Sequence, residues 1–179
     1  MTGSPVCGPA VKSMYRTYEN CTNLTGGFNC GSKVTYMVET FLNCTNLSGP
    51  ISIGPSVVNM QGTFKNCSNL QGNILLYSAN IHDFTECFAG RNVTNSLNIY
   101  VQTGSQTYST LLASTTQLTD IVLEWTTDTV NNCFCNSVYN INIYPMEDLA
   151  IAAEEDETEV NNNNSNGDDH LIGDMLEGL

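Results

Sequence analysis

Residues 57–76 read VVNMQGTFKNCSNLQGNILL, and the same pattern occupies residues 34–53 (VTYMVETFLNCTNLSGPISI) and residues 11–30 (VKSMYRTYENCTNLTGGFNC). The copies follow one another at a step of 23 residues. A fixed period of this length indicates stacked units that share one continuous core, because a single unit cannot bury its own apolar face. The recurring apolar positions that we expect to form this core are Met14, Tyr18, Cys21, Leu24, Met37, Phe41, Cys44, Leu47, Met60, Phe64, Cys67 and Leu70.

Each unit has two halves with different periods. After the glycine, apolar residues alternate by two, as at Ile51 and Ile53, which predicts a short strand with one buried face. Before it, Val57, Met60 and Phe64 are spaced by three and four, which suits about two helical or irregular turns. We therefore predict a mainly β fold, a leucine-rich-repeat-type solenoid of about four 23-residue coils with short parallel strands on one face.

The pattern extends beyond its three best copies. Residues 7–14 copy residues 53–60, and Met1 falls in register with Leu24, so the chain begins inside a repeat. We expect either that a partner covers the edge of the first strand, or that the chain is a fragment or a naturally truncated array. A weaker copy with one insertion follows at residues 81–88, where Gly90 and Arg91 replace the Asn-Cys pair. The first predicted region is therefore residues 1–94, the leucine-rich-type repeats.

Residues 95–145 form the second predicted region, a degenerate and irregular strand-rich C-terminal cap. Alternating apolar residues predict strands at 97–101, 121–125 and 138–144, and Pro145 is expected to end the last of them. Residues 108–113 are expected to form a short helix. Such a cap would close the open end of the core.

Residues 146–179 are the third predicted region, an acidic tail. They hold eleven acidic residues and no basic one, whereas residues 1–145 have a net charge of only -2. The polar and acidic stretches at residues 154–159 and 161–164 predict a disordered linker. Its end suggests either a docking peptide, which Asp168 or Asp169 would cap as a helix, or a frayed terminus weakened by two glycines. The apolar residues of this docking peptide are Leu171, Ile172, Met175, Leu176 and Leu179.

Charge and hydropathy exclude several classes of protein. The chain has no basic stripe of the kind that neutralises phosphates, so we expect no binding to nucleic acid. No stretch approaches the roughly 18 apolar residues of a membrane span. The first residues also lack the basic and apolar regions of a signal peptide.

The repeated cysteines have two possible roles, disulfide bonding and core packing. Cys21, Cys44 and Cys67 would stack on adjacent coils within disulfide distance, but we favour core packing as small apolar residues. Cys7 and Cys30 occupy the inward strand position that isoleucine fills elsewhere, which supports the same reading. Residues 133–135, Cys-Phe-Cys, lack the further ligands of a zinc site. We therefore expect no metal and no cofactor.

Polar motifs point to structure rather than chemistry. Seven Asn-x-Ser/Thr sequons invite glycosylation, but most belong to the turn of the repeat, where an asparagine ladder linking successive coils is the favoured role. We find no catalytic arrangement around His82 or His170 and expect no enzyme. Tyr15 and Tyr36 are candidates for an exposed binding face. The sequons begin at Asn20, Asn23, Asn43, Asn46, Asn66, Asn92 and Asn163.

The unit resembles the BspA-like leucine-rich repeat in its Met-Phe-Cys variant. The residues that carry the resemblance are Met60-Gln-Gly-Thr-Phe64-Lys-Asn-Cys67-Ser-Asn-Leu70, with weaker copies on either side over residues 1–90. The strands LNIYV and YNINIY are also similar to the ends of such arrays in gut bacteria and their phages. The resemblance implies a β-solenoid that mediates binding on bacterial surfaces or in virions.

Two functions follow as expectations. The favoured one is a phage virion structural or accessory component of the capsid or tail, assembled in the bacterial cytoplasm and packed against other subunits or copies of itself. The alternative is a bacterial cell-surface adhesin or ligand-binding module that contacts a host-surface ligand, and this chain would then be a piece of that longer repeat protein. Both are non-enzymatic interaction proteins.

Overall fold

A computed structural model of the chain describes residues 3–116 and 140–149. The chain divides into two compact units, Met1–Met146 and Glu147–Leu179, and the first contains every strand and helix named below. The strand predicted at 121–125, residues 138 and 139, the Cys133–Cys135 pair and the docking peptide at residues 171–179 lie outside the described residues.

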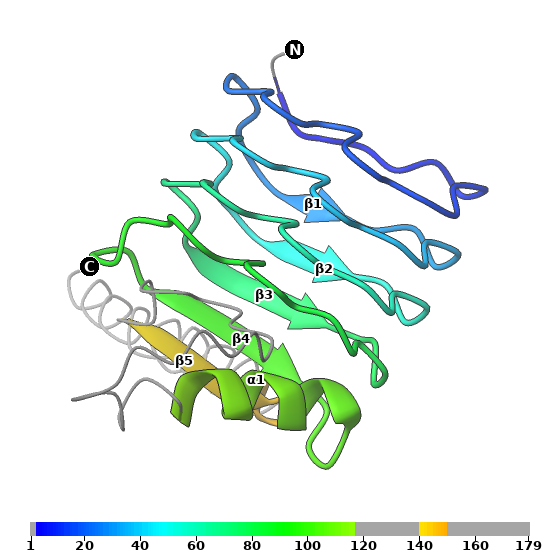
Figure 1. The fold of residues 1–179 in the computed structure, drawn as a ribbon, viewed down its shortest axis with the longest axis vertical. Coiled ribbons are helices and arrows are strands. Elements are labelled where there is room, and N and C mark those ends of the chain that lie inside the picture. Colours follow the sequence, from blue (N-terminus) through cyan, green and yellow to red (C-terminus); the bar gives the residue numbers. More distant parts are fainter. Residues whose placement is uncertain (1–2, 117–139, 150–179) are drawn as a thin grey trace, which may run out of the picture. The chain divides into compact units, whose positions relative to one another are not determined.

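The first unit is built on one sheet of five parallel strands arranged in chain order, as Figure 1 shows. The first two steps of the register equal the sequence period, because Phe28 pairs with Ile51 and Ile51 pairs with Ile74. The predicted short parallel strands with one buried face are confirmed in this sheet. Its strands are β1 (Phe28–Asn29), β2 (Ile51–Ile53), β3 (Gly72–Leu76), β4 (Leu97–Val101) and β5 (Ile141–Pro145).

The leg that returns from one strand to the next consists of hydrogen-bonded turns and contains no α-helix in the coils that the structure describes. The spacing of Met37 and Phe41 resembles that of a helix, but Glu39 between them has a φ of 53°. Arg16 and Gly62 have the same left-handed conformation in the neighbouring coils, with φ of 49° and 57°. A right-handed helix cannot contain such a residue, so the irregular alternative is the one that the chain adopts.

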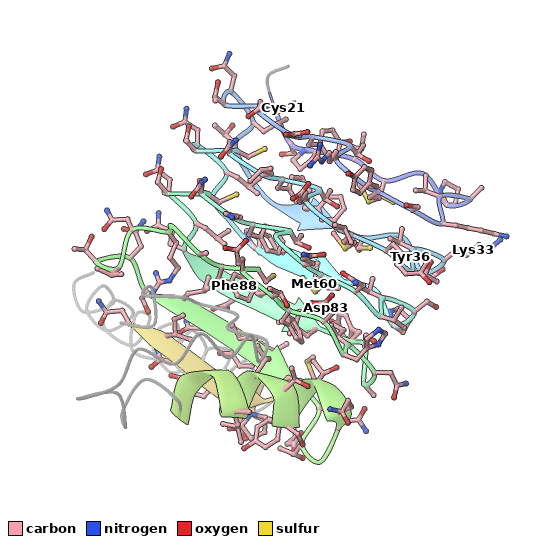
Figure 2. The ribbon with its side chains drawn as sticks, viewed as in Figure 1. Cys21, Lys33, Tyr36, Met60, Asp83 and Phe88 are labelled. Atoms are coloured by element: carbon pink, nitrogen blue, oxygen red, sulfur yellow. The ribbon has the colours of Figure 1, made fainter. Side chains whose placement is uncertain are left out.

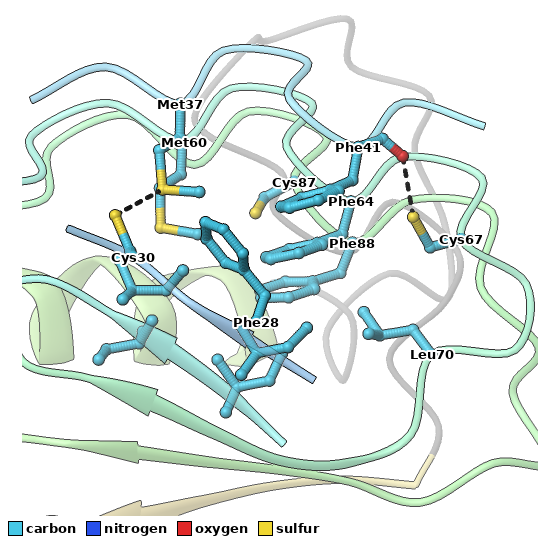
Figure 3. Packing of buried hydrophobic residues seen from close by; sticks show 14 of the residues in the cluster. Phe28, Cys30, Met37, Phe41, Met60, Phe64, Cys67, Leu70, Cys87 and Phe88 are labelled. Atoms are coloured by element: carbon cyan, nitrogen blue, oxygen red, sulfur yellow. Dashed lines mark hydrogen bonds between the residues drawn. The ribbon is translucent and has the colours of Figure 1, made fainter. Parts of the chain in front are cut away.

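The core between the sheet and the return legs contains a column of parallel aromatic rings (Figure 3). The ring centroids of Phe41 and Phe64 are 5.5 Å apart, and those of Phe64 and Phe88 are 5.7 Å apart. Tyr18 begins the column at 5.4 Å from Phe41, and its hydroxyl donates a hydrogen bond to the carbonyl oxygen of Val6 over 2.6 Å. One ring per coil therefore fills the centre of the core, which explains the aromatic position of the repeat.

Buried threonine hydroxyls link neighbouring return legs. The hydroxyl of Thr63 lies 2.7 Å from the carbonyl oxygen of Met37 and 2.8 Å from that of Met60. Thr40 makes the equivalent contacts with Met14 and Met37, each at 2.8 Å. Each of these carbonyl oxygens also accepts a backbone amide within its own turn, so the hydroxyl adds a second hydrogen bond and ties one return leg to the next.

The region after the regular coils contains the helix α1 (Gln106–Thr116), which Figure 1 shows at one end of the stack. It confirms the helix predicted at 108–113 and extends it in both directions. The hydroxyl of Thr107, which is fully buried, accepts a hydrogen bond from the amide of Ile81 and donates one to the carbonyl oxygen of Ser78. Leu111 is also fully buried, so α1 contributes to the core at this end.

β4 confirms the strand predicted at 97–101, and β5 differs from its prediction at the C-terminal end. Pro145 belongs to β5 and pairs with Val101, whereas it was expected to lie beyond the strand. Proline lacks an amide hydrogen, but the carbonyl oxygen of Val101 accepts its hydrogen bond from the next amide, that of Met146, over 3.0 Å. The strand therefore tolerates proline as its last residue.

Candidate binding surface

The outward side of strands β3, β4 and β5 carries a grid of asparagine and tyrosine side chains, which we call the polar-aromatic face. Alternation along each strand produces it, because Ile74, Leu76 and Ile99 point inward and are fully buried while their neighbours point outward. The sheet register then aligns the outward residues across the strands. The face comprises Asn73, Leu75, Tyr77, Asn98, Tyr100, Asn142 and Tyr144.

One row of the polar-aromatic face is a ladder of side-chain amides. The Nδ2 of Asn98 donates to Oδ1 of Asn73 over 3.0 Å, and the Nδ2 of Asn142 donates to Oδ1 of Asn98 over 3.0 Å. Asn73 and Asn142 are exposed, and Asn98 between them is half-buried. The ladder holds three amides in a line that runs across the strands.

The next row of the face is apolar and aromatic. Leu75 pairs in register with Tyr100, and Tyr100 pairs with Tyr144. The two tyrosine rings stack with centroids 5.2 Å apart and an interplanar angle of 27°. Tyr77 extends the face beyond the end of β3, and half of its surface is exposed (50%). Rigid, amphipathic tyrosines next to asparagines are the combination that antibody binding sites also favour.

The five strands contain no charged residue. Within the described residues the ion pairs lie on the return legs, where Arg16 pairs with Glu39 and Lys65 pairs with Glu86 over 2.6 Å. Depletion of charge and enrichment of aromatic residues are characteristic of the centre of an interface. The polar-aromatic face shares both of these features of composition.

The predicted core residues belong to the buried cluster of the first unit or pack against it. All are buried except Cys21, which is only partly buried and packs against the core cluster. Cys7 is likewise partly buried, whereas Cys30 at the equivalent strand position is buried. Cys7 and Cys21 both lie in the first described coil, which contacts a neighbouring coil on one side only. Less of their surface is therefore covered than in the later coils. The buried members are Met14, Tyr18, Leu24, Met37, Phe41, Cys44, Leu47, Met60, Phe64, Cys67 and Leu70.

The buried thiols act as hydrogen-bond donors. The Sγ of Cys44 lies 2.9 Å from the carbonyl oxygen of Tyr18, and the Sγ of Cys67 lies 3.1 Å from that of Phe41 (Figure 3). Burial raises the pKa of Cys44 to about 11 and raises the pKa of Cys67 well above its usual range. Both residues therefore stay protonated at neutral pH, and these two thiols are poor nucleophiles.

The expected asparagine ladder at the turn of the repeat is confirmed. The Nδ2 of Asn43 donates to Oδ1 of Asn20 over 2.8 Å, and the Nδ2 of Asn66 donates to Oδ1 of Asn43 over 2.9 Å. All three residues are left-handed, with φ between 59° and 63°, a conformation that asparagine tolerates better than most residues. A Cβ on Gly90, the next residue of this series, would lie 2.2 Å from Oδ1 of Asn66, so the ladder ends there.

The two tyrosines predicted to be exposed lie on the return legs, away from the sheet. Tyr15 and Tyr36 expose 58% and 51% of their surface, and the Arg16 guanidinium lies over the Tyr15 ring at 5.2 Å. Figure 2 shows Lys33 extending away from the coils near Tyr36. Tyr36 shares a row with Ser13 and with Asn59, linked by isolated bridges rather than by a strand. These tyrosines therefore do not belong to the polar-aromatic face.

No group of three or more histidine, cysteine, aspartate or glutamate side chains is placed to hold a metal ion in the part of the chain that the structure describes. Among the same residues, no helix is long and apolar enough to cross a bilayer.

Sequence reasoning missed the polar-aromatic face, although a signal for it was present. Residues 98–100 and 142–144 share the triplet Asn-Ile-Tyr, one copy in each of the last two strands. The triplets are 44 residues apart, outside the 23-residue period, and only the pairing of β4 with β5 brings them side by side.

Comparison with known proteins returned one family. A family model described as "Mycoplasma protein of unknown function, DUF285" matches residues 9–96 and again residues 53–142, so its two matches together span most of the chain. No curated protein and no solved structure matched the sequence.

Proposed function

The chain belongs to the DUF285 family, and we propose that it is a non-enzymatic binding protein that contacts its partner through the polar-aromatic face. We infer that its coils are a leucine-rich-repeat-type solenoid of about four 23-residue units, close to the BspA-like repeat. The observation that carries the proposal is the uncharged grid of asparagine and tyrosine side chains on strands β3 to β5. Function then lies in a surface that the stacked coils hold rigid.

The setting that we favour is a phage virion, where the protein is a capsid or tail component or an accessory to one, packed against other subunits. The hydrogen bonds that the Cys44 and Cys67 thiols donate support folding under reducing conditions, because a disulfide at either residue would abolish its bond. Bacterial cytoplasm, where virions assemble, keeps thiols reduced.

The second candidate is a cell-surface adhesin or ligand-binding module. The composition of the polar-aromatic face favours it, because exposed tyrosine and asparagine are typical of surfaces that bind a ligand in solution. In this setting the sheet would face a host-surface ligand.

Immunogold electron microscopy distinguishes the two settings. An antibody raised against the whole chain would be applied to purified phage particles and, separately, to intact cells of the source organism. Labelled particles would support the virion component, and labelled cell surfaces would support the adhesin. Labelling of neither, in cultures where immunoblotting detects the protein, would refute both settings.

A further inference from the structure

We propose that the polar-aromatic face binds an uncharged carbohydrate chain, which lies across strands β3, β4 and β5. This inference rests on the proposed binding function and adds the chemical class of the ligand. Three properties of the face carry it: the spacing of its rows, the hydrogen-bonding capacity of its amides, and its neutrality.

The rows of the face run across the strands at the spacing of a parallel sheet, about 4.8 Å from one strand to the next. Asn73, Asn98 and Asn142 form one row, and Tyr100 and Tyr144 belong to the next. One hexose unit of a linear polysaccharide has a comparable length. Successive sugar units can therefore meet successive side chains of a row with the same geometry.

The amide row retains hydrogen-bonding capacity toward a ligand. A side-chain amide offers two N–H donors and two lone pairs, and the ladder uses one N–H of Asn98 and one of Asn142. Asn73 only accepts a hydrogen bond within the ladder, so the ladder uses neither of its N–H groups. Sugar hydroxyls both donate and accept, so a hydroxyl-rich chain can satisfy each of these groups.

The tyrosines next to the amide row supply the apolar part of such a site. Stacking of Tyr100 on Tyr144 fixes both rings, so little side-chain entropy is lost when a ligand binds. Tyr77 offers half of its surface at the end of β3. Sugar rings present C–H faces that pack on aromatic rings, and the tyrosine hydroxyl adds a polar group at the edge of the contact.

The same features disfavour two other ligands. A charged polymer would find no opposite charge on these strands, because they contain no lysine, arginine, histidine, aspartate or glutamate. An apolar protein surface would bury the amides of Asn73 and Asn142 without partners, which costs about 1–3 kcal/mol for each unsatisfied group. A neutral polyhydroxylated chain avoids both penalties.

Titration of the full-length protein with defined oligosaccharides tests the proposal. The probes are maltohexaose, cellohexaose and the hexamer of N-acetylglucosamine, which are neutral, and a hyaluronan oligosaccharide of similar length, which is anionic. We expect isothermal titration calorimetry to detect binding of at least one neutral hexamer and a weaker response to hyaluronan. We expect Tyr77→Ala and Asn98→Ala each to weaken that binding by about tenfold.

Two further variants keep the test interpretable. Tyr15→Ala removes a tyrosine of similar exposure from a return leg and should leave binding unchanged. Tyr144→Phe keeps the stacked ring and removes only the hydroxyl, so it tests the face without opening the sheet should an alanine variant fail to fold.

Absence of binding to all three neutral hexamers, a preference for hyaluronan, or equal binding by the face variants and Tyr15→Ala would overturn the carbohydrate proposal. A protein partner that binds the full-length chain and is lost in Tyr77→Ala would overturn it as well, while leaving the proposed binding function intact.

Discussion

Replacing Asn43 by alanine tests the physical reason for asparagine at the turn of the repeat. Its side chain makes two hydrogen bonds in the ladder, to Asn20 over 2.8 Å and from Asn66 over 2.9 Å. Its backbone is left-handed, with a φ of 63°. Alanine removes both side-chain hydrogen bonds and also strains the left-handed backbone, so these two effects on the free energy of unfolding must be separated.

The expected loss can be worked from these two effects. An exposed neutral hydrogen bond contributes about 0.5–1 kcal/mol net, so the two bonds account for about 1–2 kcal/mol. Alanine lacks the short polar side chain that lets asparagine adopt the left-handed region, where an ordinary residue costs roughly 1–2 kcal/mol. We therefore expect Asn43→Ala to lower the free energy of unfolding by about 2–4 kcal/mol.

Asn46 provides a matched control three residues away. Its Nδ2 donates to the carbonyl oxygen of Thr22 over 2.7 Å, and its Oδ1 accepts from Asn69 over 3.1 Å. Asn46 is not among the described residues with positive φ, so Asn46→Ala removes two similar hydrogen bonds without backbone strain. We expect this variant to lose about 1–2 kcal/mol.

Guanidinium denaturation followed by circular dichroism measures the free energy of unfolding of both variants and of the parent chain. A third variant, Asn43→Gly, removes the ladder bonds but accepts the left-handed backbone, so it should be less destabilised than Asn43→Ala. Equal losses for Asn43→Ala and Asn46→Ala would refute the backbone explanation. Losses below about 0.5 kcal/mol in both would refute the energetic role of the ladder.

Three further predictions concern the core. Phe64→Ala removes the middle of the aromatic column and should cost about 3–5 kcal/mol in the same denaturation assay, whereas Phe64→Leu should cost clearly less. Thr63→Val keeps the shape but removes the hydroxyl that contacts the carbonyl oxygens of Met37 and Met60. These oxygens keep their backbone hydrogen bonds, so we expect a loss of about 0.5–1.5 kcal/mol and partial recovery in Thr63→Ser. Burial raises the pKa of Cys44 from 9.0 to about 11 in the folded chain. Burial of the protonated thiol therefore stabilises the folded chain fully below pH 9, and this contribution is lost as the pH rises toward 11. A shift of this size corresponds to about 2–3 kcal/mol, and an unfolding free energy that falls as steeply over this range in Cys44→Ala as in the parent chain would contradict the assignment.

Local pattern was a good guide to the coils because each coil repeats the same local chemistry. The alternation at Ile51 and Ile53, the aromatic position of Phe64 and the turn asparagine Asn43 each have a counterpart 23 residues away, so one physical explanation serves every copy. The conformation of the return leg was beyond this reasoning. Spacings of three and four fit a helix and an irregular leg equally well, and the left-handed backbone at Glu39 has no signature in its side chain.

The amino-acid order alone thus determined the period, the core positions and the short strands, because these follow from apolar spacing within about two dozen residues. Tertiary structure decided the polar-aromatic face. Asn98 and Asn142 are 44 residues apart, and only the parallel pairing of β4 with β5 places their amides 3.0 Å from each other. Contacts across such a separation depend on how the intervening chain closes, and a local pattern carries no information about that closure.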